Sequence, residues 1–102
     1  VFTFPDYSDD ELLTILQDLV ASRKPRFSVA DPKILRIAAR RLGMQRGMTG
    51  FGNARAVRNL YEQARARQAS RVQALNEAGE LPENGEERRA AMLRFEREDF
   101  LG

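Results

Sequence analysis

The chain has 102 residues, of which 42% are hydrophobic and 31% charged, a size and balance typical of one globular domain. It has no apolar run long enough to cross a membrane and neither cysteine nor histidine. This composition excludes disulfides, thiolate and imidazole metal sites, and most familiar pairs of nucleophile and general base. We therefore do not expect a self-contained enzyme. Because the chain begins at Val1, we expect it to be a piece of a longer protein.

The net charge of +2 hides three segments of different sign. Residues 1–20 hold five acids and no base, residues 21–76 hold thirteen bases and two acids, and residues 77–102 hold four bases and eight acids. A basic middle between acidic ends could bind a polyanion, or it could be the internal charge balance of a folded helical domain. The distribution alone leaves both interpretations open, and we favour the second.

The first helix is predicted to begin just after Ser8. Residues 1–7 are expected to be extended, since Pro5 disfavours helix at the residue before it. Ser8 and Glu11 form a capping-box pattern, and early acids suit the positive end of a helix dipole. Apolar residues then recur at helical spacing until Pro25. The pattern predicts a helix over residues 9–23.

Two more helices are predicted from similar signals. Asp31 as a cap and Pro32 at the first helical position predict a second helix over residues 32–45. Asn53 is the expected cap of the third and longest helix, over residues 53–78. On a helical wheel its apolar residues share one arc of about 120°, which we expect to face the core. These residues are Val57, Leu60, Tyr61, Ala64, Val72 and Leu75.

The last quarter of the chain is predicted to be less regular. Glycine and proline break the third helix after Ala78, and a short fourth helix is expected over residues 86–95. Residues 96–102 are expected to form a turn or a linker, and no pair of strands is predicted. The chain is therefore predicted to be an all-α domain of four helices with short connections.

The candidates for catalysis are weak. Asp9 and Asp10 are adjacent, but neighbouring helix positions point about 100° apart, and acids are common at helix starts. The other acidic groups, Glu86 with Glu87 and Glu96 with Glu98 and Asp99, are interpreted as solvated charge. A phosphate-cradling loop of the form GxxxxGK[ST] is absent from the sequence. The chain is not expected to hydrolyse a nucleotide alone.

Nucleic-acid binding is disfavoured by the arrangement of the arginines in the third helix. On a helical wheel Arg58 lies about 140° and Arg65 about 120° from Arg71, so the charges are split between both flanks of the apolar arc. A nucleic-acid-binding helix needs its basic side chains on one face, with aromatic residues among them for stacking. Tyr61, however, lies in the arc expected to be buried.

The stretch GFGNARAVRNL, residues 50–60, places two arginines where a helix least favours them. Arg55 is expected in the first turn and Arg58 in the second, near the positive end of the dipole, at a cost of a few tenths to about 1 kcal/mol each. The simple interpretation is an Asn cap followed by incidental arginines. The alternative is a site for a phosphate or a carboxylate, made by the arginines and the free N–H groups of the helix start.

At these residues the sequence resembles the small helical lid domain that closes an AAA+ ATPase module. FPDYSDDELLTILQDLV and the later FGNARAVRNLYEQARARQASRV are similar to the branch that contains the stage V sporulation protein K and CbbX-type Rubisco activases. The resemblance covers about residues 2–72. The matching positions are Phe4, Tyr7, Glu11, Leu12, Gly52, Asn53, Arg55, Val57, Arg58, Asn59, Glu62, Arg67, Gln68 and Arg71.

The resemblance implies roles for five of these residues in nucleotide binding. Arg55 occupies the position of the sensor-2 arginine, which reaches the γ-phosphate, while Gly52 and Asn53 would let the backbone pass close to the nucleotide. Arg58 would support the site or pair with an acid on the same or a neighbouring subunit. Tyr7, at the junction with the large domain, would contact the adenine or simply be packed.

The resemblance also implies a cofactor and partners for the parent protein. ATP with Mg²⁺ would be bound mainly by a large domain carrying the Walker motifs, joined to the chain through residues 1–7, and no cofactor is expected for the chain alone. The neighbouring subunits of a ring and an unknown protein substrate would be further partners, with chaperone-like remodelling as the activity.

The ending FEREDFLG resembles a junction that leads into a further AAA+ module. The absence of cysteine fits a cytoplasmic or nuclear protein, and no membrane partner is expected. The alternative functions are a helical nucleic-acid-binding module and a protein-interaction module.

Overall fold

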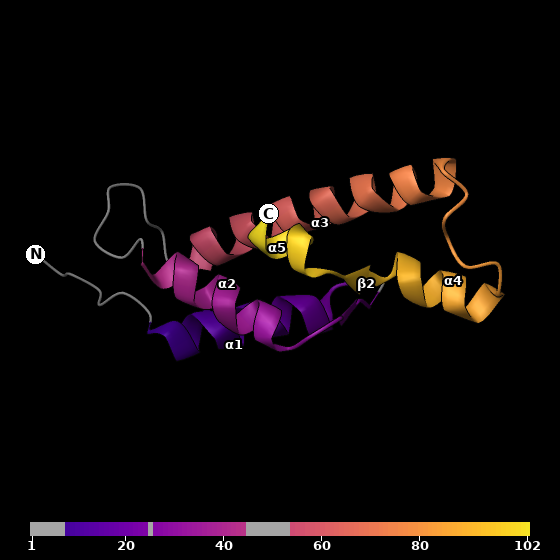
Figure 1. Cartoon of the computed structure of the whole chain (residues 1–102). Helices are drawn as coiled ribbons and strands as arrows, with labels where there is room; N and C mark the ends of the chain where they lie inside the picture. Colours follow the sequence, from indigo (N-terminus) through magenta and orange to yellow (C-terminus); the bar gives the residue numbers. More distant parts are fainter. Residues whose placement is uncertain (1–7, 25, 45–53) are drawn as a thin grey trace, which may run out of the picture.

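The computed structural model describes residues 8–24, 26–44 and 54–102. In this part of the chain, five helices and two very short strands follow one another (Figure 1). They are α1 (Asp9–Ser22), β1 (Ser28–Val29), α2 (Lys33–Gly43), α3 (Ala54–Glu77), α4 (Gly85–Met92), β2 (Arg94–Phe95) and α5 (Arg97–Leu101). The predicted helical fold class is confirmed, and a fifth helix and a two-stranded sheet are added to it.

Helix α1 begins with the predicted capping box. The hydroxyl of Ser8 accepts a hydrogen bond from the backbone N–H of Glu11 at 3.1 Å, and the Glu11 carboxylate accepts one from the N–H of Ser8 at 3.0 Å. Two N–H groups at the helix start are satisfied in this way. The helix then buries Leu12, Leu16 and Val20, which lie four residues apart on one face.

Helix α2 packs beside α1 and exposes its opposite face (Figure 1). The carboxylate of Asp31 accepts a hydrogen bond from the N–H of Lys33 at 2.9 Å, but the cap of α2 is Pro32, so the predicted cap at Asp31 lies one residue too early. The buried side chains are Ile34, Leu35, Ala38, Ala39 and Leu42. The helix spans residues 33–43, slightly less than the predicted 32–45.

Helix α3 has 24 residues and runs past the ends of α1 and α2 (Figure 1). Its first half buries Val57, Tyr61 and Ala64, as the predicted arc requires. Val72 and Leu75, which belong to the same arc, are only half-buried, as is Leu60. For Val72 and Leu75 the reason is that α1 and α2 cover only the first half of α3, so its second half has fewer neighbours.

The prediction that no strands pair is wrong. Strands β1 and β2 form a parallel pair in which Ser28 is aligned with Arg94 and Val29 with Phe95. The N–H of Ser28 donates to the carbonyl of Leu93 at 2.9 Å, and the N–H of Ala30 donates to that of Phe95 at 3.0 Å. The predicted fourth helix therefore ends at Met92 instead of Phe95, because an extended backbone carries the Phe95 ring into the core.

Phe95 lies at the centre of an aromatic cluster and is completely buried. Its ring centroid lies 4.9 Å from that of Phe27, 4.8 Å from that of Phe100 and 6.1 Å from that of Tyr61. These separations are those of favourable tilted and edge-on aromatic pairs. Phe95 thus joins β1, α3 and α5 in one core.

The prediction of a turn or linker over residues 96–102 is wrong in its local structure, because α5 occupies most of this segment. Phe100 is 4% exposed and Asp99 only 1%. Phe100 needs a helical turn to reach the space between α2 and α3, which are both neighbours of α5. The expectation that a further module follows stays a prediction.

Asp99 is buried because Arg71 neutralises it. Nε and Nη2 of Arg71 donate to the two carboxylate oxygens of Asp99 at 3.1 and 3.0 Å. Nη2 also donates to the carbonyl of Arg94, and an oxygen of Asp99 accepts the N–H of Glu96 at 2.8 Å. The hydrogen bonds to Asp99 raise the pKa of Arg71 above its ordinary value. Arg71 is therefore charged at every physiological pH.

Gln68 makes a second link between α3 and the end of the chain. Its side chain is 4% exposed and donates to the carbonyl of Met92 at 2.6 Å. Gln68 and Arg71 lie one turn apart on α3, so together they hold the backbone on both sides of Leu93. Gln68 and Arg71, two of the positions that match the lid domains, are thus structural in this part of α3.

Helix α4 is the least buried of the five helices, with no buried residue. Asn84 caps its start, accepting from the N–H groups of Glu86 and Glu87. Helix α4 is tied to α3 by a hydrogen bond of 2.6 Å from the guanidinium of Arg88 to the side-chain oxygen of Asn76. Leu81, 7% exposed, lies in the connection between α3 and α4. Helix α4 and the second half of α3 form an arm that extends beyond the core (Figure 1).

We predict that Phe95→Ala lowers the free energy of unfolding by about 3 to 5 kcal/mol, because it removes the ring shared by three aromatic neighbours. Urea unfolding followed by circular dichroism measures this loss. Met92→Ala is the control, because Met92 is 40% exposed, and it should cost less than about 1 kcal/mol. A similar small loss for Phe95→Ala would show that the aromatic cluster does not stabilise the fold.

We also predict that Asp99→Ala costs about 3 kcal/mol, since it leaves Arg71 without its partner and removes a cap from α5. In a double-mutant cycle with Arg71→Met, the double variant should be at least about 1 kcal/mol more stable than the sum of the single losses allows. Arg94→Gln breaks the more exposed Arg94–Glu96 pair and should cost less than about 1 kcal/mol. Additive losses in the cycle would contradict the coupling.

Candidate functional site

The candidate site is the start of α3, where the two arginines of the anion-site hypothesis lie. Arg55 is the second residue of the helix, and Arg58 follows it by three positions. Both side chains are exposed, and residues three apart on a helix are neighbours on its surface. The structure therefore brings these two arginines together. The other three candidates, Tyr7, Gly52 and Asn53, lie outside the described residues.

The backbone at the start of α3 is held firmly by the core. Val57 is fully buried and Tyr61 is 2% exposed, so the first two turns are anchored in the core. Arg65 donates to the hydroxyl of Tyr61 at 3.3 Å and stacks over the ring of Phe27 at 4.4 Å. A ligand that contacts Arg55 would thus bear on a rigid element.

The electrostatics of the start of α3 differ from those of α1. The first turn of α1 carries three acids, which compensate the positive end of its dipole. The first turn of α3 carries no acid and includes Arg55. The positive side chain and the positive end of the dipole therefore add, which favours an anion at this place.

The described arginines divide into those with a partner among the described residues and those without one there. Arg41, Arg65, Arg71, Arg88 and Arg94 each donate a hydrogen bond, and Arg23 lies 5.7 Å from the centre of the Tyr61 ring. Arg55 and Arg58 have no hydrogen bond or ion pair with any residue in ranges 8–24, 26–44 and 54–102. None of the described residues therefore competes with a ligand for their donors.

The start of α3 lies at the same end of the molecule as the start of α1 and the end of α2 (Figure 1). The distal arm formed by α3 and α4 lies at the opposite end (Figure 1). The candidate site and the weakly packed arm are therefore separated by the length of α3, and they are joined by one continuous helix.

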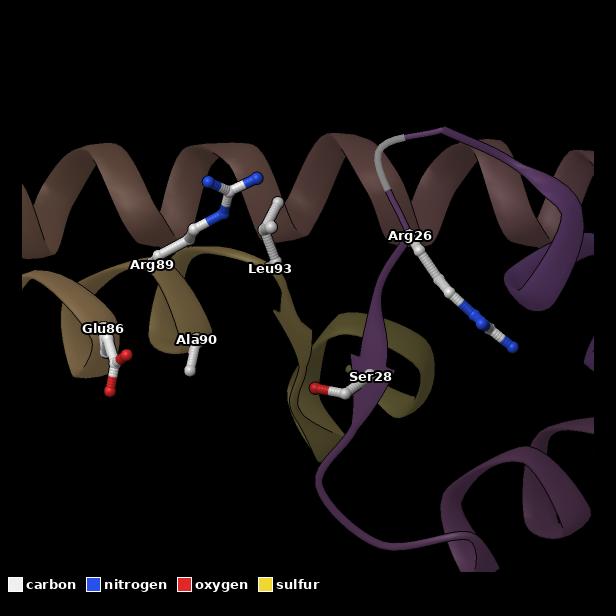
Figure 2. A pocket seen from close by; sticks show the side chains of 6 residues that line it. All are labelled: Arg26, Ser28, Glu86, Arg89, Ala90 and Leu93. Atoms are coloured by element: carbon white, nitrogen blue, oxygen red, sulfur yellow. The ribbon is translucent and has the colours of Figure 1, made fainter.

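A hollow of about 340 Å³ between β1 and α4 is a weaker candidate (Figure 2). Its lining includes Arg26, Arg89 and Glu86, but the guanidinium groups of the two arginines point away from each other. Ser28 points into the space between the elements without a second polar group facing it (Figure 2). The side chains do not converge on one ligand, so this hollow lacks the geometry of a binding site.

The described part of the chain has neither a cluster of metal-binding side chains nor a membrane-spanning helix. Among these residues, no group of three acidic side chains is placed to hold a metal ion. In the same part of the chain, no helix is long and apolar enough to span a membrane.

Three residues that organise the end of the chain were missed by the search for functional residues. Asp99 was interpreted as solvated charge, while Gln68 and Arg71 were noted only as positions of a motif. The available signal was their spacing, since two polar side chains one turn apart on the core side of a helix need buried partners. The sequence offered several acids near the end of the chain without indicating which one Arg71 binds.

Comparison with known proteins gives consistent results. The family model of the AAA lid domain matches residues 8–101. Protein CbbX of Cereibacter sphaeroides is 36% identical over 69 residues, which cover 68% of this chain and 21% of the relative. A CfxQ homolog of Pyropia yezoensis is 39% identical over 75 residues, 72% of this chain and 24% of the relative. No solved structure matches the chain significantly.

The match to a chloroplastic cbbX homolog of Guillardia theta extends over 99 residues at 32% identity, covering 96% of this chain and 25% of the relative. The chain thus spans about a quarter or less of the length of these relatives. The family model covers nearly all of it, including α4 and α5. The chain belongs to the AAA lid domain family and is distantly related to the CbbX and CfxQ proteins.

Proposed function

We propose that this domain closes over ATP bound by a large AAA+ domain of the parent protein and that Arg55 senses the terminal phosphate. The observation that carries the proposal is the start of α3, where an exposed arginine adds to the positive end of the helix and the first turn has no acid. Membership of the AAA lid family supplies the large domain as the partner in cis.

The residues present fit a phosphate group. A guanidinium can donate two parallel hydrogen bonds to phosphate oxygens, and its planar fork fixes their orientation better than a lysine would. Arg55 would make this contact, with Arg58 adding positive charge beside it. Gly52 and Asn53 would line the approach and Tyr7 would lie near the adenine. The Mg²⁺ that accompanies ATP would be held by the large domain.

Arg55 would couple the nucleotide state to the position of the whole domain. ATP supplies a terminal phosphate that is lost on hydrolysis. While this phosphate is present, Arg55 has a partner and the domain is held closed. When it leaves, Arg55 loses that partner and the preferred angle of the domain changes. Because Val57 and Tyr61 anchor α3 in the core, the domain would move as a rigid body and pass the motion to neighbouring subunits of a ring.

We predict that Arg55→Ala in the full-length parent lowers its ATPase rate by about 10- to 100-fold, measured by phosphate release under saturating ATP. In the isolated domain the same change should alter the free energy of unfolding by less than about 0.5 kcal/mol, because Arg55 is exposed. The matched control is Arg67→Ala, an exposed arginine about 120° away on the same helix, which should leave the ATPase rate unchanged. A large stability loss in the isolated domain would overturn the sensing role.

Arg58 is proposed to add charge without reporting hydrolysis. We therefore predict that Arg58→Ala raises the KM for ATP a few-fold in the full-length parent and leaves kcat unchanged, as expected for uniform binding. Steady-state kinetics at low and high ionic strength measure both constants, and the effect on KM should shrink as salt screens the charge. A fall in kcat as large as that of Arg55→Ala would give Arg58 the sensing role.

A further inference from the structure

The outward face of α2 carries three basic residues. Lys33, Arg36 and Arg40 are all exposed and lie within an arc of about 60° on a helical wheel, directly opposite the buried side of the helix. We call these three residues the basic face of α2. The helix contains no acid, and none of the three makes a hydrogen bond or ion pair through its side chain within the described ranges.

This arrangement is unfavourable for an isolated helix. Lys33 and Arg36 are three residues apart and Arg36 and Arg40 four apart, so like charges repel along the surface. Lys33 also stands at the first position of α2, near the positive end of its dipole. Arg40 alone is favoured, because it lies in the last turn. A partner of opposite charge would relieve all of these repulsions.

Apolar surface accompanies the basic face. Met44 is 78% exposed and falls on the same side of the helix, about 20° from Lys33 on the wheel. Ile37, between Arg36 and Arg40 along the chain, is only half-buried. A charged surface with an exposed methionine beside it can combine electrostatic attraction with apolar contact, as protein interfaces do.

The same chain carries a surface of complementary charge. Residues 77–87, which comprise the end of α3, the connection and the start of α4, contain five glutamates and no basic residue. All five, Glu77, Glu80, Glu83, Glu86 and Glu87, are exposed. We call them the acidic tip. The nearest bases along the chain are Arg71, which is bound to Asp99, and Arg88 and Arg89 on α4, of which Arg88 is bound to Asn76.

The two surfaces face different regions of space. The acidic tip is at the end of the distal arm, whereas α2 lies over α1 at the other end of the molecule (Figure 1). They are therefore available to contact each other between two copies of the chain. We propose that the basic face of α2 in one copy docks on the acidic tip of a second copy.

Such a contact is head-to-tail, because it joins different surfaces of the two copies. Repeated contacts of this type close into a ring or extend as a chain. The contact involves few residues and exposed charges, so it should be weak and strongly dependent on salt. The inference uses none of the residues assigned to nucleotide sensing, and it stands or falls independently of that proposal.

A nucleic acid is the other class of partner that a basic face could bind. The structure favours a protein surface, because the basic face has only three residues and the next arginine of α2, Arg41, donates to the carbonyl of Leu101. Arg65 and Arg71 are occupied by contacts within the domain. The acidic tip would also repel phosphates, while it attracts α2 of a second copy.

The test is sedimentation velocity of the 102-residue chain at low and high ionic strength. At about 20 mM salt the mean mass should rise with protein concentration, and at about 300 mM salt the chain should be monomeric. Two charge-reversed variants should each lose self-association by at least about tenfold. One is Arg36→Glu with Arg40→Glu, and the other is Glu83→Lys with Glu86→Lys.

An equimolar mixture of the two reversed variants is the decisive sample. The first variant keeps its acidic tip and the second keeps its basic face, so the mixture restores the complementary pair and should associate again. The control matched to the first variant is Arg67→Glu with Arg97→Glu. It makes the same change in net charge as Arg36→Glu with Arg40→Glu, but at two other exposed positions, and should self-associate like the original chain. Circular dichroism melting checks that each variant is folded, and Arg36→Gln with Arg40→Gln replaces the first variant if it is not.

Three outcomes would overturn the proposal. The original chain could remain monomeric at low salt at every concentration reached. The mixture of reversed variants could remain monomeric, which would exclude pairing between these two surfaces. Self-association could survive the reversal of Arg36 and Arg40 while binding to a short DNA duplex is lost, which would make the basic face a nucleic-acid surface.

Discussion

The buried carboxylate of Asp99 is the group on which the arrangement of the C-terminal third depends. With 1% of its surface exposed, its charge has lost its water, and this desolvation is tolerated only because three hydrogen bonds replace it. Arg71 supplies two of them and also holds the carbonyl of Arg94. The backbone on both sides of Phe95 is thereby placed, so that its ring can enter the aromatic cluster. The parallel sheet, α5 and the closure of the core follow from this attachment.

Local signals in the sequence account for the first three helices. The capping box at Ser8 and the apolar spacing of α1 to α3 involve residues within a few positions of one another, and the structure has these features at the predicted places. The cap of α2 differs by one residue, because it is Pro32 instead of Asp31. The sheet and α5 could not be read in this way. Ser28 forms a hydrogen bond with Leu93, and Arg71 binds Asp99, which lies 28 residues further along the chain. Strands of two residues are also too short to show an alternating pattern.

The candidate site was predicted in part for a physical reason that survives in the structure. Arg55 and Arg58 oppose the helix dipole, and this conflict can be recognised from position alone. Arginines that are used for packing look the same in a sequence, however. The structure separates Arg65 and Arg71, which are committed to internal partners, from the exposed pair at the start of α3. Family membership adds that a large AAA+ domain would face this pair of arginines. The properties of the two side chains do not reveal the identity of that domain.

The continuity of α3 has a geometric consequence. A helix of 24 residues without a break is about 36 Å long and bends little, so it acts as a lever between its two ends. A rotation of the domain by about 10° around the start of α3 would displace the far end of the helix by about 6 Å. A change in angle too small to alter any contact around Val57 therefore becomes, at the end of the arm, a displacement larger than a side chain's width. The displacement of the arm for a given rotation of the domain is therefore set by the length of α3.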